Sequence, residues 1–374
     1  MNLRNLFLSV ILLTVSMLVI EFGLRLLTPF PIHAHSANRV EDPYLIYRLS
    51  PSLQDADGSG FRNSAVPDEV NIVALGDSHT FGFNVRSEDS WPQQLARMSN
   101  MTVYNFGLGG YGSLHYYYLI NEAIKLKPRH LILALYLHND LNDVCKTMRK
   151  LPYWQSWAEE KGFDVEACYE GGDPRSNDRQ TEEGLSRSLR ENTAIASLFS
   201  YVWGMVAQRF TAAGEFIVVD DENNPTLIST GVVDAEGLSG IRFMDLDRKQ
   251  IALGYEITKY ALEEAKKKCD ANNIEFSVVF IPSKVMAYFN YLQGRPNQLH
   301  DSYYELVAKE RILLDRFSSI LDDLSVNHVD AGPYVLRKMN KASAVYMRSS
   351  DDHPLVPGYS AYAEAVYDKL LARD

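Results

Sequence analysis

The sequence is poor in cysteine and in positive charge, and both shortages narrow the classes of protein to which it can belong. Its 374 residues include three cysteines, Cys145, Cys168 and Cys269, with no Cys-x-x-Cys pair that would indicate zinc. Cys145 and Cys168 flank one irregular segment, so they either pair in an oxidising compartment or remain free thiols. Lys and Arg number 37 against 48 Asp and Glu, which argues against nucleic-acid binding, because phosphate contacts need concentrated positive charge.

Signatures of metal and nucleotide chemistry are missing as well. None of the nine His residues shows a ligand spacing such as His-Glu-x-x-His. The Gly-rich stretch 107–112 has the wrong spacing for a dinucleotide fingerprint. The sequence therefore predicts chemistry that needs no metal ion and no other cofactor.

An apolar run stands near the N-terminus. It has no charge over 6–20, and it extends to Leu27 if Glu21 and Arg25 are tolerated as an i, i+4 pair. A cleaved signal peptide is the alternative, but the best small-residue cleavage site lies far beyond the run. Residues 1–30 are therefore predicted to be an uncleaved single-pass membrane anchor, with the lipid bilayer as its partner and the rest of the chain outside the cytoplasm.

The remainder divides into a lead-in, a domain and an insert. Residues 31–69 are rich in Pro, Ser and Asp without periodicity, which is typical of a loosely structured tether. Apolar strand-like runs then alternate with helix-like stretches from 70 to 374. The segment 145–245 breaks this alternation and is too long for a plain loop, so we predict an inserted cap or small subdomain with one helix near 193–208.

The alternation predicts an α/β fold of three layers, α/β/α, with a flavodoxin-like parallel sheet. Strands are expected at 71–75, 102–105, 131–137, 275–281 and 327–329, and helices at 90–99, 114–125, 251–272, 303–324 and 356–372. Sites in such sheets form at the carboxyl ends of the strands. The residues that follow each strand are therefore the candidates for function.

A serine follows the first predicted strand, in the run Gly-Asp-Ser-His-Thr-Phe-Gly from Gly76 to Gly82. With glycine on both sides, Ser78 can stand on a sharp turn with its hydroxyl and its own N–H facing outward, free to attack an ester and to bind an oxyanion. An ordinary turn that leads into a helix cap is the alternative.

Two further loops contain groups that can donate to an oxyanion. Four glycines occur between Gly107 and Gly112 after the second predicted strand, where backbone N–H groups can face an anion. Asn139 follows the third strand and can donate through its amide, or simply cap a helix. His138 beside it is interpreted as incidental, and Lys284, after a later strand, either lines the cleft or is an exposed lysine.

A histidine with neighbouring carboxylates precedes the last predicted helix, in the run Asp351-Asp352-His353-Pro354. A carboxylate near a histidine can orient the ring and stabilise its protonated form, as in a Ser-His-Asp triad. An Asp helix cap beside an exposed His is the alternative.

In order and placement, these motifs resemble the SGNH/GDSL hydrolase family over about 70–371, with the insert outside the resemblance. The resemblance implies that Ser78 is the nucleophile and His353 the general base. It implies Asp351 as the supporting acid, with Asp352 as the less favoured choice. The amide of Ser78, Gly110 and Asn139 would form the oxyanion hole.

The chain departs from the family pattern at two positions. Leu137 stands where a glycine usually precedes the Asn motif, and Ser350 stands where the acid often lies, three residues before His353. The first departure concerns local backbone geometry, and the second leaves the choice of acid open. The anchor and the segment 280–284 also look like a bacterial subset that modifies exopolysaccharide and the cell envelope.

These features predict a serine esterase, bound to the bacterial inner membrane with its catalytic domain in the periplasm or outside the cell. Its substrate would be an O-acyl, most simply acetyl, ester on an envelope glycan. One alternative is an O-acetyltransferase that uses the same triad on exopolysaccharide. Another is a non-catalytic, membrane-tethered protein that binds glycan or assists its assembly.

Overall fold

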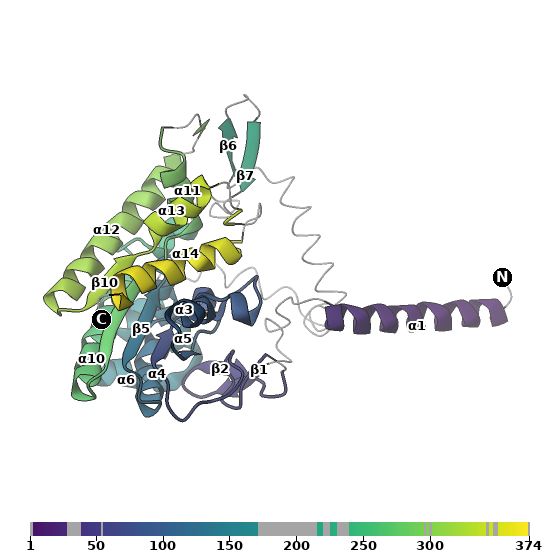
Figure 1. The fold of residues 1–374 in the computed structure, drawn as a ribbon, viewed down its shortest axis with the longest axis horizontal. Helices are drawn as coiled ribbons and strands as arrows, with labels where there is room; N and C mark the ends of the chain where they lie inside the picture. The colour runs from purple at the N-terminus through teal and green to yellow at the C-terminus, as the bar shows by residue number, and fades with distance from the viewer. Residues whose placement is uncertain are drawn as a thin grey trace. The chain divides into compact units, whose positions relative to one another are not determined.

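The structure is a computed structural model that describes residues 3–27, 39–53, 55–170, 215–219, 225–229, 239–294, 297–298, 301–341, 344–346 and 351–372. The chain divides into two compact units, one of which comprises 1–39 and 173–211, and the other 40–172 and 212–374. Of the first unit, the helix α1 (Leu3–Leu27) is described. The second unit contains every other element (Figure 1).

The elements of the second unit alternate along much of the chain. The strands are β1 (Arg39–Asp42, at the boundary of the two units), β2 (Ile46–Leu49), β3 (Ile72–Leu75), β4 (Val103–Asn105), β5 (His130–Leu135), β6 (Glu215–Val219), β7 (Pro225–Ser229), β8 (Glu275–Phe280), β9 (Asn297–Gln298) and β10 (Asn327–Asp330). The α-helices are α2 (Ser78–Phe81), α3 (Trp91–Ser99), α4 (Ser113–Lys125), α5 (Asp140–Lys150), α6 (Pro152–Glu160), α9 (Ser239–Phe243), α10 (Lys249–Ala271), α11 (Lys284–Tyr291), α12 (Asp301–Asp323), α13 (Gly332–Asn340) and α14 (Val356–Val366). Short 3₁₀ turns η3 (Ser87–Asp89) and η4 (Val165–Cys168) and a π-helical end η5 (Tyr367–Leu371) complete them.

Five strands form one parallel sheet in the order β10–β8–β5–β3–β4. β3 lies between β4 and β5, with Ile72 opposite Val103 on one side and Leu75 opposite Leu133 on the other. Counted along the chain within this sheet, the order is 2-1-3-4-5 from the β4 edge, which is the doubly wound order of flavodoxin-like folds. The prediction of a parallel α/β sheet is confirmed.

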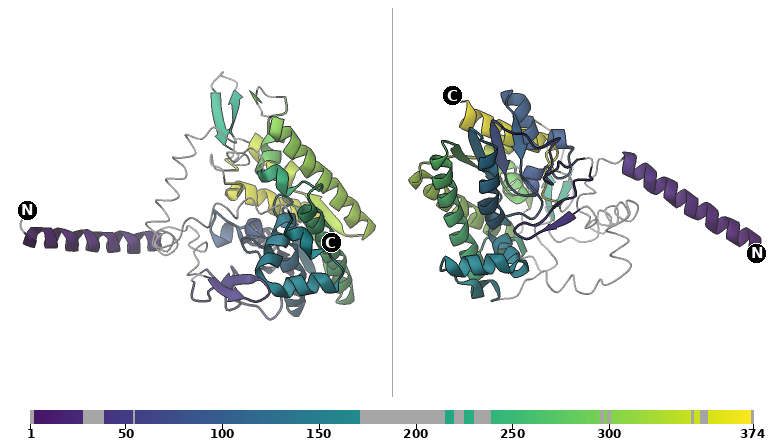
Figure 2. Two further views of the ribbon diagram at one scale, coloured as in Figure 1. Left: turned by 180° about the vertical axis from the view of Figure 1, so that it is seen from behind. Right: turned by 90° about the horizontal axis from the view of Figure 1, so that it is seen from below.

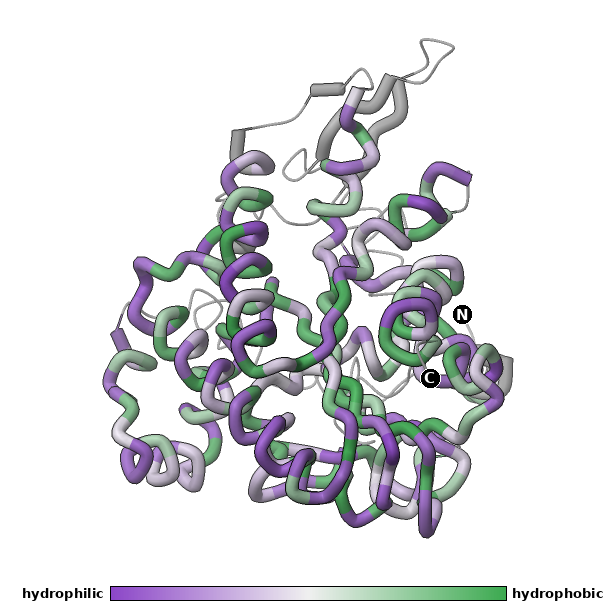
Figure 3. The backbone as a smooth tube through the Cα atoms, turned by 60° about the vertical axis from the view of Figure 1, so that its left-hand side comes forward, coloured by the Kyte–Doolittle hydropathy of each residue, from purple (hydrophilic) through white to green (hydrophobic). Residues whose placement is uncertain are grey.

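The sheet is covered by helices on both faces (Figures 1 and 2). Along β3, Val73 and Leu75 pack into a core shared with α4, α10 and α12, whereas Ile72 and Ala74 pack into a core shared with α3, α13 and α14. Hydrophobic and hydrophilic residues alternate along the helices in Figure 3, as expected for helices with one buried and one exposed face. Because strands buried on both faces read as continuous apolar runs, these strands could be located from the sequence.

The lead-in before β3 differs from the prediction of a loose tether over 31–69. Its strands β1 and β2 form a two-stranded sheet. Phe61 and Arg62 that follow are 0% and 2% exposed, respectively. Phe61 packs edge-to-face on Phe106 with ring centroids 4.7 Å apart, and burial of one such side chain contributes about 1.5–3 kcal/mol. The predicted domain boundary at 70 is therefore too late, because the lead-in contributes to the core.

The segment predicted as an insert over 145–245 also begins within the compact unit. The end of α5, the helix α6 and the turn η4 form a buried cluster with α4 and α10, in which Trp154 is fully buried. A disulfide joins Cys145 to Cys168, so of the two open alternatives the cysteines pair. The helix expected near 193–208 lies outside the described residues.

The predicted membrane anchor corresponds to α1, which is helical over Leu3–Leu27. In the part of the chain that the structure describes, no helix was found with both the length and the apolar character needed to cross a membrane. The membrane anchor and its bilayer partner remain predictions.

Candidate active site

Ser78 stands where the chain turns sharply from β3 into α2. Asp77 caps this turn, since its Oδ1 accepts a hydrogen bond from the N–H of His79 at 2.9 Å. A Cβ placed on Gly76 would lie 2.0 Å from Thr80 Oγ1, so the turn requires glycine there. The conformation of the Gly-Asp-Ser turn is thus set by the lack of space for a side chain at Gly76 and by the helix cap at Asp77.

The buried Arg62 stabilises the far side of the same turn. Its guanidinium donates to three backbone carbonyls at 2.8–3.2 Å, those of Phe81, Gly82 and Val85. A residue of the lead-in therefore donates to carbonyls at the C-terminal end of α2 and in the loop that follows it, where helix geometry supplies no donor.

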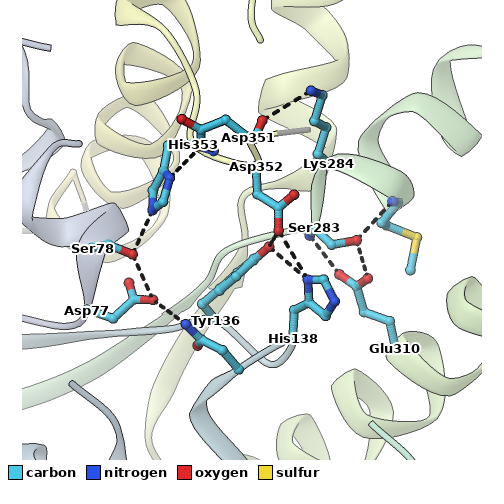
Figure 4. A network of polar contacts seen from close by, with 12 residues as sticks. Asp77, Ser78, Tyr136, His138, Ser283, Lys284, Glu310, Asp351, Asp352 and His353 are labelled. Carbon is cyan, nitrogen blue, oxygen red and sulfur yellow. Dashed lines mark hydrogen bonds and ion pairs between the residues drawn. The ribbon is translucent and has the colours of Figure 1, made fainter. Parts of the chain in front are cut away.

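His353 reaches Ser78 from the other end of the domain (Figure 4). The distance from His353 Nε2 to Ser78 Oγ is 2.7 Å, and that from His353 Nδ1 to Asp351 Oδ1 is 2.6 Å. The second carboxylate oxygen of Asp351 accepts from Asn84 Nδ2 at 2.7 Å. Hydroxyl, imidazole and carboxylate therefore form one hydrogen-bonded row, in which the imidazole can accept the serine proton.

Aromatic rings enclose the imidazole of His353. The rings of Phe83 and His79 lie 4.7 Å and 4.9 Å from it, centroid to centroid. His79 is buried, and burial lowers its pKa well below the ordinary value, so its ring is uncharged. The ring of His353 thus contacts one apolar ring and one uncharged ring.

The charges in the row favour a base at His353. Burial alone would lower the pKa of His353, but the hydrogen bond and negative charge of Asp351 prevail and raise it above the ordinary value. The pKa of Asp351 is lowered, because the hydrogen bonds from His353 and Asn84 outweigh its burial. Asp77, which is fully buried, has a pKa raised to about 6 by that burial.

Of the expected oxyanion donors, Asn139 contacts the network around Ser78, whereas Gly110 follows Gly109, the glycine that lies next to Ser78. A Cβ built on Gly109 would come within 3.9 Å of Ser78 Cβ, and one built on Gly110 within 3.6 Å of Lys146 Nζ. Gly110 has a φ of +75°, which favours glycine. Asn139 Nδ2 donates at 3.2 Å to Asp77 Oδ2, the oxygen that lies 3.5 Å from the Ser78 hydroxyl.

The adjacent carboxylate, Asp352, points away from Ser78 and His353. Its Oδ2 accepts from the hydroxyl of Tyr136 at 2.8 Å and lies 3.3 Å from Nδ1 of His138. Of the two candidate acids, Asp351 is therefore the one that contacts the imidazole of His353.

Three residues that the sequence analysis did not place in the site contact this network: Asn84, Tyr136 and His138, which was interpreted as incidental. Lys284, for which a cleft-lining and an exposed position were both considered, is 0% exposed and also contacts it. His138 follows the strand predicted at 131–137 and Tyr136 lies at the end of that strand, so their position at a strand end was a signal. Asn84 carried none, because it follows the nucleophile by six residues in an irregular loop.

Among the described residues, no group of three or more His, Cys, Asp or Glu side chains is arranged to hold a metal ion. The chemistry available to the row above is proton transfer and nucleophilic attack by a hydroxyl.

Comparison with known proteins gives structural matches without sequence matches. The sequence matches no protein-family model and no curated protein. Solved structures that match include a member of the lipolytic protein G-D-S-L family from Veillonella parvula, at 11% identity and a TM-score of 0.38 over 81% of this chain and 98% of the other. An esterase from Pseudoalteromonas matches at 12% identity and a TM-score of 0.35, over 81% of this chain and 97% of the other. A catalytic mutant of an acetylxylan esterase from Geobacillus stearothermophilus matches at 10% identity and a TM-score of 0.37, over 81% of this chain and 95% of the other.

At such low identities and TM-scores these matches add no argument about substrate or mechanism. The sequence motifs and the hydrogen-bond geometry of the site are observed in this chain independently of those matches. A Gly-Asp-Ser turn follows the first strand of the parallel sheet, and an Asp-x-His motif before the last helix meets it. The order of these motifs and the meeting of Ser78, His353 and Asp351 at the strand ends agree with the resemblance to the SGNH/GDSL hydrolase family.

Proposed function

We propose that the protein is a serine esterase that transfers the acyl group of an O-acyl ester first to Ser78 and then to water. The row of hydrogen bonds from Asp351 through His353 to the Ser78 hydroxyl is the observation that carries this proposal. A hydroxyl becomes a competent nucleophile at neutral pH when an adjacent base accepts its proton.

In the first step, Ser78 Oγ attacks the ester carbonyl while His353 Nε2 takes the hydroxyl proton. The protonated imidazole, stabilised by Asp351, returns that proton to the departing alcohol as the C–O bond breaks. In the second step, His353 takes a proton from a water molecule while the water oxygen attacks the carbonyl carbon of the acyl-enzyme. The bond between that carbon and Ser78 Oγ then breaks, and His353 returns the proton to Ser78 Oγ.

The oxyanion of each tetrahedral intermediate would be held by the N–H groups of Ser78 and Gly110 and by the amide of Asn139. Support comes from the place of Asn139, whose Nδ2 shares the Asp77 carboxylate with the Ser78 hydroxyl. Loss of one such donor typically costs about 10²–10³ in rate.

We further propose that the substrate is an acylated glycan of a bacterial envelope and that the protein works outside the cytoplasm. The disulfide between Cys145 and Cys168 supports an oxidising compartment. Thiol labelling of the denatured, unreduced protein should then modify one cysteine, Cys269, which is free and buried. Labelling of three cysteines would contradict the compartment but not the esterase.

The esterase is tested with the full chain, p-nitrophenyl acetate and a fluorophosphonate probe. Wild type should hydrolyse the ester and take up the probe, and Ser78→Ala should do neither. Unchanged hydrolysis by Ser78→Ala would show that Ser78 is not the nucleophile, and a wild type inert to both reagents would favour a glycan-binding protein. Transfer of acetate to an added oligosaccharide in place of water would favour the O-acetyltransferase.

A further inference from the structure

The segment that carries the acid and the base has little regular structure of its own. Asp351 and His353 lie outside any helix or strand, and the bridge between Pro354 and Tyr346 is the nearest backbone pairing. A triad on irregular backbone needs surrounding side chains to fix it, because displacements near 1 Å cost about 10²-fold in rate. The contacts on this segment therefore bear directly on catalysis.

One contact comes from the end of β5 through Asp352. The carboxylate of Asp352 accepts the Tyr136 hydroxyl at 2.8 Å, and the same oxygen lies 3.3 Å from His138 Nδ1. Burial would raise the pKa of Asp352, but the hydrogen bonds from His138 and Tyr136 prevail and lower it, so the carboxylate is charged. Asp352 thus ties the residue between the acid and the base to the sheet.

A second contact comes from Lys284, the first residue of α11, which follows β8 after a short turn. Its Nζ donates to the backbone carbonyl of Asp351 at 3.1 Å, and the side chain is 0% exposed. The backbone at Lys284 is fixed in turn, because the N–H and hydroxyl of Ser283 donate to the buried carboxylate of Glu310 at 2.9 Å and 2.5 Å. Figure 4 shows the lysine above the loop and the Asp352 carboxylate turned toward Tyr136.

The Lys284 ammonium also interacts electrostatically with the carboxylates of this segment. Two consecutive carboxylates, Asp351 and Asp352, face it, together with the Tyr346 ring, whose centroid is 5.9 Å from Nζ. Burial lowers the pKa of Lys284 to about 8 against the pull of the two carboxylates, so at pH 7 the ammonium is charged. A buried cation beside two carboxylates stabilises both in their ionised form.

We propose that Lys284 and Asp352 are positioning residues that clamp the Asp351–His353 segment from β8 and β5, and that Lys284 also compensates its negative charge. Neither residue touches the reacting atoms. Asp352 acts by holding the backbone between acid and base, and Lys284 acts by holding the Asp351 carbonyl. This inference rests on the proposed esterase activity for its kinetic readout.

The test is Lys284→Met, which keeps the length of the side chain and removes its charge. The expected result is a fall in kcat of about 10- to 100-fold with little change in KM, because transition-state geometry is lost and substrate binding is not. The acid limb of the pH–rate profile should move to higher pH, because loss of a nearby positive charge favours protonated His353. Asp351, Asp352 and Asp77 are the carboxylates that act on that imidazole, and His79 is its neutral neighbour.

The control is Lys268→Met on α10, where the Nζ lies 4.5 Å from the centroid of the Tyr117 ring and donates to Asn121. This variant should keep wild-type kcat and pH profile. A folded Lys284→Met protein with both quantities unchanged would overturn the proposal. If Lys284→Met does not fold, Tyr136→Phe decides, since it removes one donor from Asp352: reduced kcat supports the clamp and wild-type kcat rejects it.

An NMR titration of the His353 ring separates this inference from the proposed function, because it requires no turnover. The ring should titrate at higher pH in Lys284→Met than in wild type. If wild type hydrolyses no ester and this shift is still present, the esterase fails and the charge compensation stands. If the ring titrates identically in an active enzyme, the esterase stands and the role of Lys284 fails.

Discussion

Two carboxylate–imidazole pairs lie side by side in this protein, and they differ in what stands beyond the imidazole. In the first, Asp351 holds His353, whose Nε2 meets the Ser78 hydroxyl at 2.7 Å. In the second, Asp352 lies 3.3 Å from His138, whose buried Nε2 has no hydrogen-bond partner among the described residues. Both carboxylates come from consecutive residues. The two pairs are therefore chemically alike and differ in their neighbours, and we propose that one supplies the base and the other supports it.

The largest difference between the pairs should appear when each imidazole is removed. We expect His353→Gln to lower kcat/KM by about 10⁴-fold or more, because the imidazole at 2.7 Å is the closest potential base to Ser78 Oγ among the described residues, whereas the Asp77 carboxylate lies at 3.5 Å. Steady-state hydrolysis of p-nitrophenyl acetate measures this. Retention of more than a tenth of the activity would contradict the assignment of His353 as the base.

The two carboxylates should differ next. Asp351→Asn is expected to lower kcat by about 10³–10⁴-fold, because an amide favours the wrong tautomer of His353. Asp352→Asn is the matched control and should cost about 10- to 100-fold, as expected for a loss of positioning alone. Equal losses in the two variants would abolish the distinction between the pairs.

The pH dependence of wild type sharpens the comparison further. His353 must be neutral to accept the serine proton, and its pKa is raised by Asp351 above the ordinary 6.5. The value of kcat/KM should therefore fall with decreasing pH along a limb whose midpoint lies above 6.5, by about tenfold for each pH unit below it. Asp351→Asn removes the charge that raises this pKa, so its limb should lie at lower pH than that of wild type. A limb that stays in place would show that another group sets it.

The smallest effect is expected for the second imidazole. His138→Gln removes one contact of Asp352 and leaves the Tyr136 hydroxyl in place, so we expect kcat to fall by about tenfold or less. The fall should occur without a change in KM. A loss as large as that of His353→Gln would mean that His138 takes part in proton transfer.

Much of the sheet and its helices could be predicted from the sequence. β3 was expected at 71–75 and spans Ile72–Leu75, and α3 was expected at 90–99 and spans Trp91–Ser99. Buried strands of a parallel sheet are continuous apolar runs, and amphipathic helices show a period of 3.6, so both leave a local signal. Short helices such as α13 (Gly332–Asn340) were missed, because nine residues give too few periods.

The site divides in the same way. Ser78, Asn139 and His353 could be grouped because each follows a strand or precedes a helix in an ordered set of motifs. The contacts of Asn84 and Lys284 with Asp351 could not be predicted, because they span 267 and 67 residues and leave no local pattern. The lead-in was misjudged for the opposite reason: its Pro, Ser and Asp content is that of a linker, although Arg62 is buried.

The burial of Arg62 has a practical consequence for protein production. A fragment trimmed to begin at residue 70, where the apolar strands start, would lack the guanidinium that donates to the carbonyls of Phe81, Gly82 and Val85. Each of these carbonyls would lose its hydrogen bond from Arg62 directly after the serine turn, and loss of such a buried hydrogen bond costs about 1–3 kcal/mol of folding free energy. The shortest recombinant version worth expressing for crystallisation or assay therefore starts near Arg39, at the first strand.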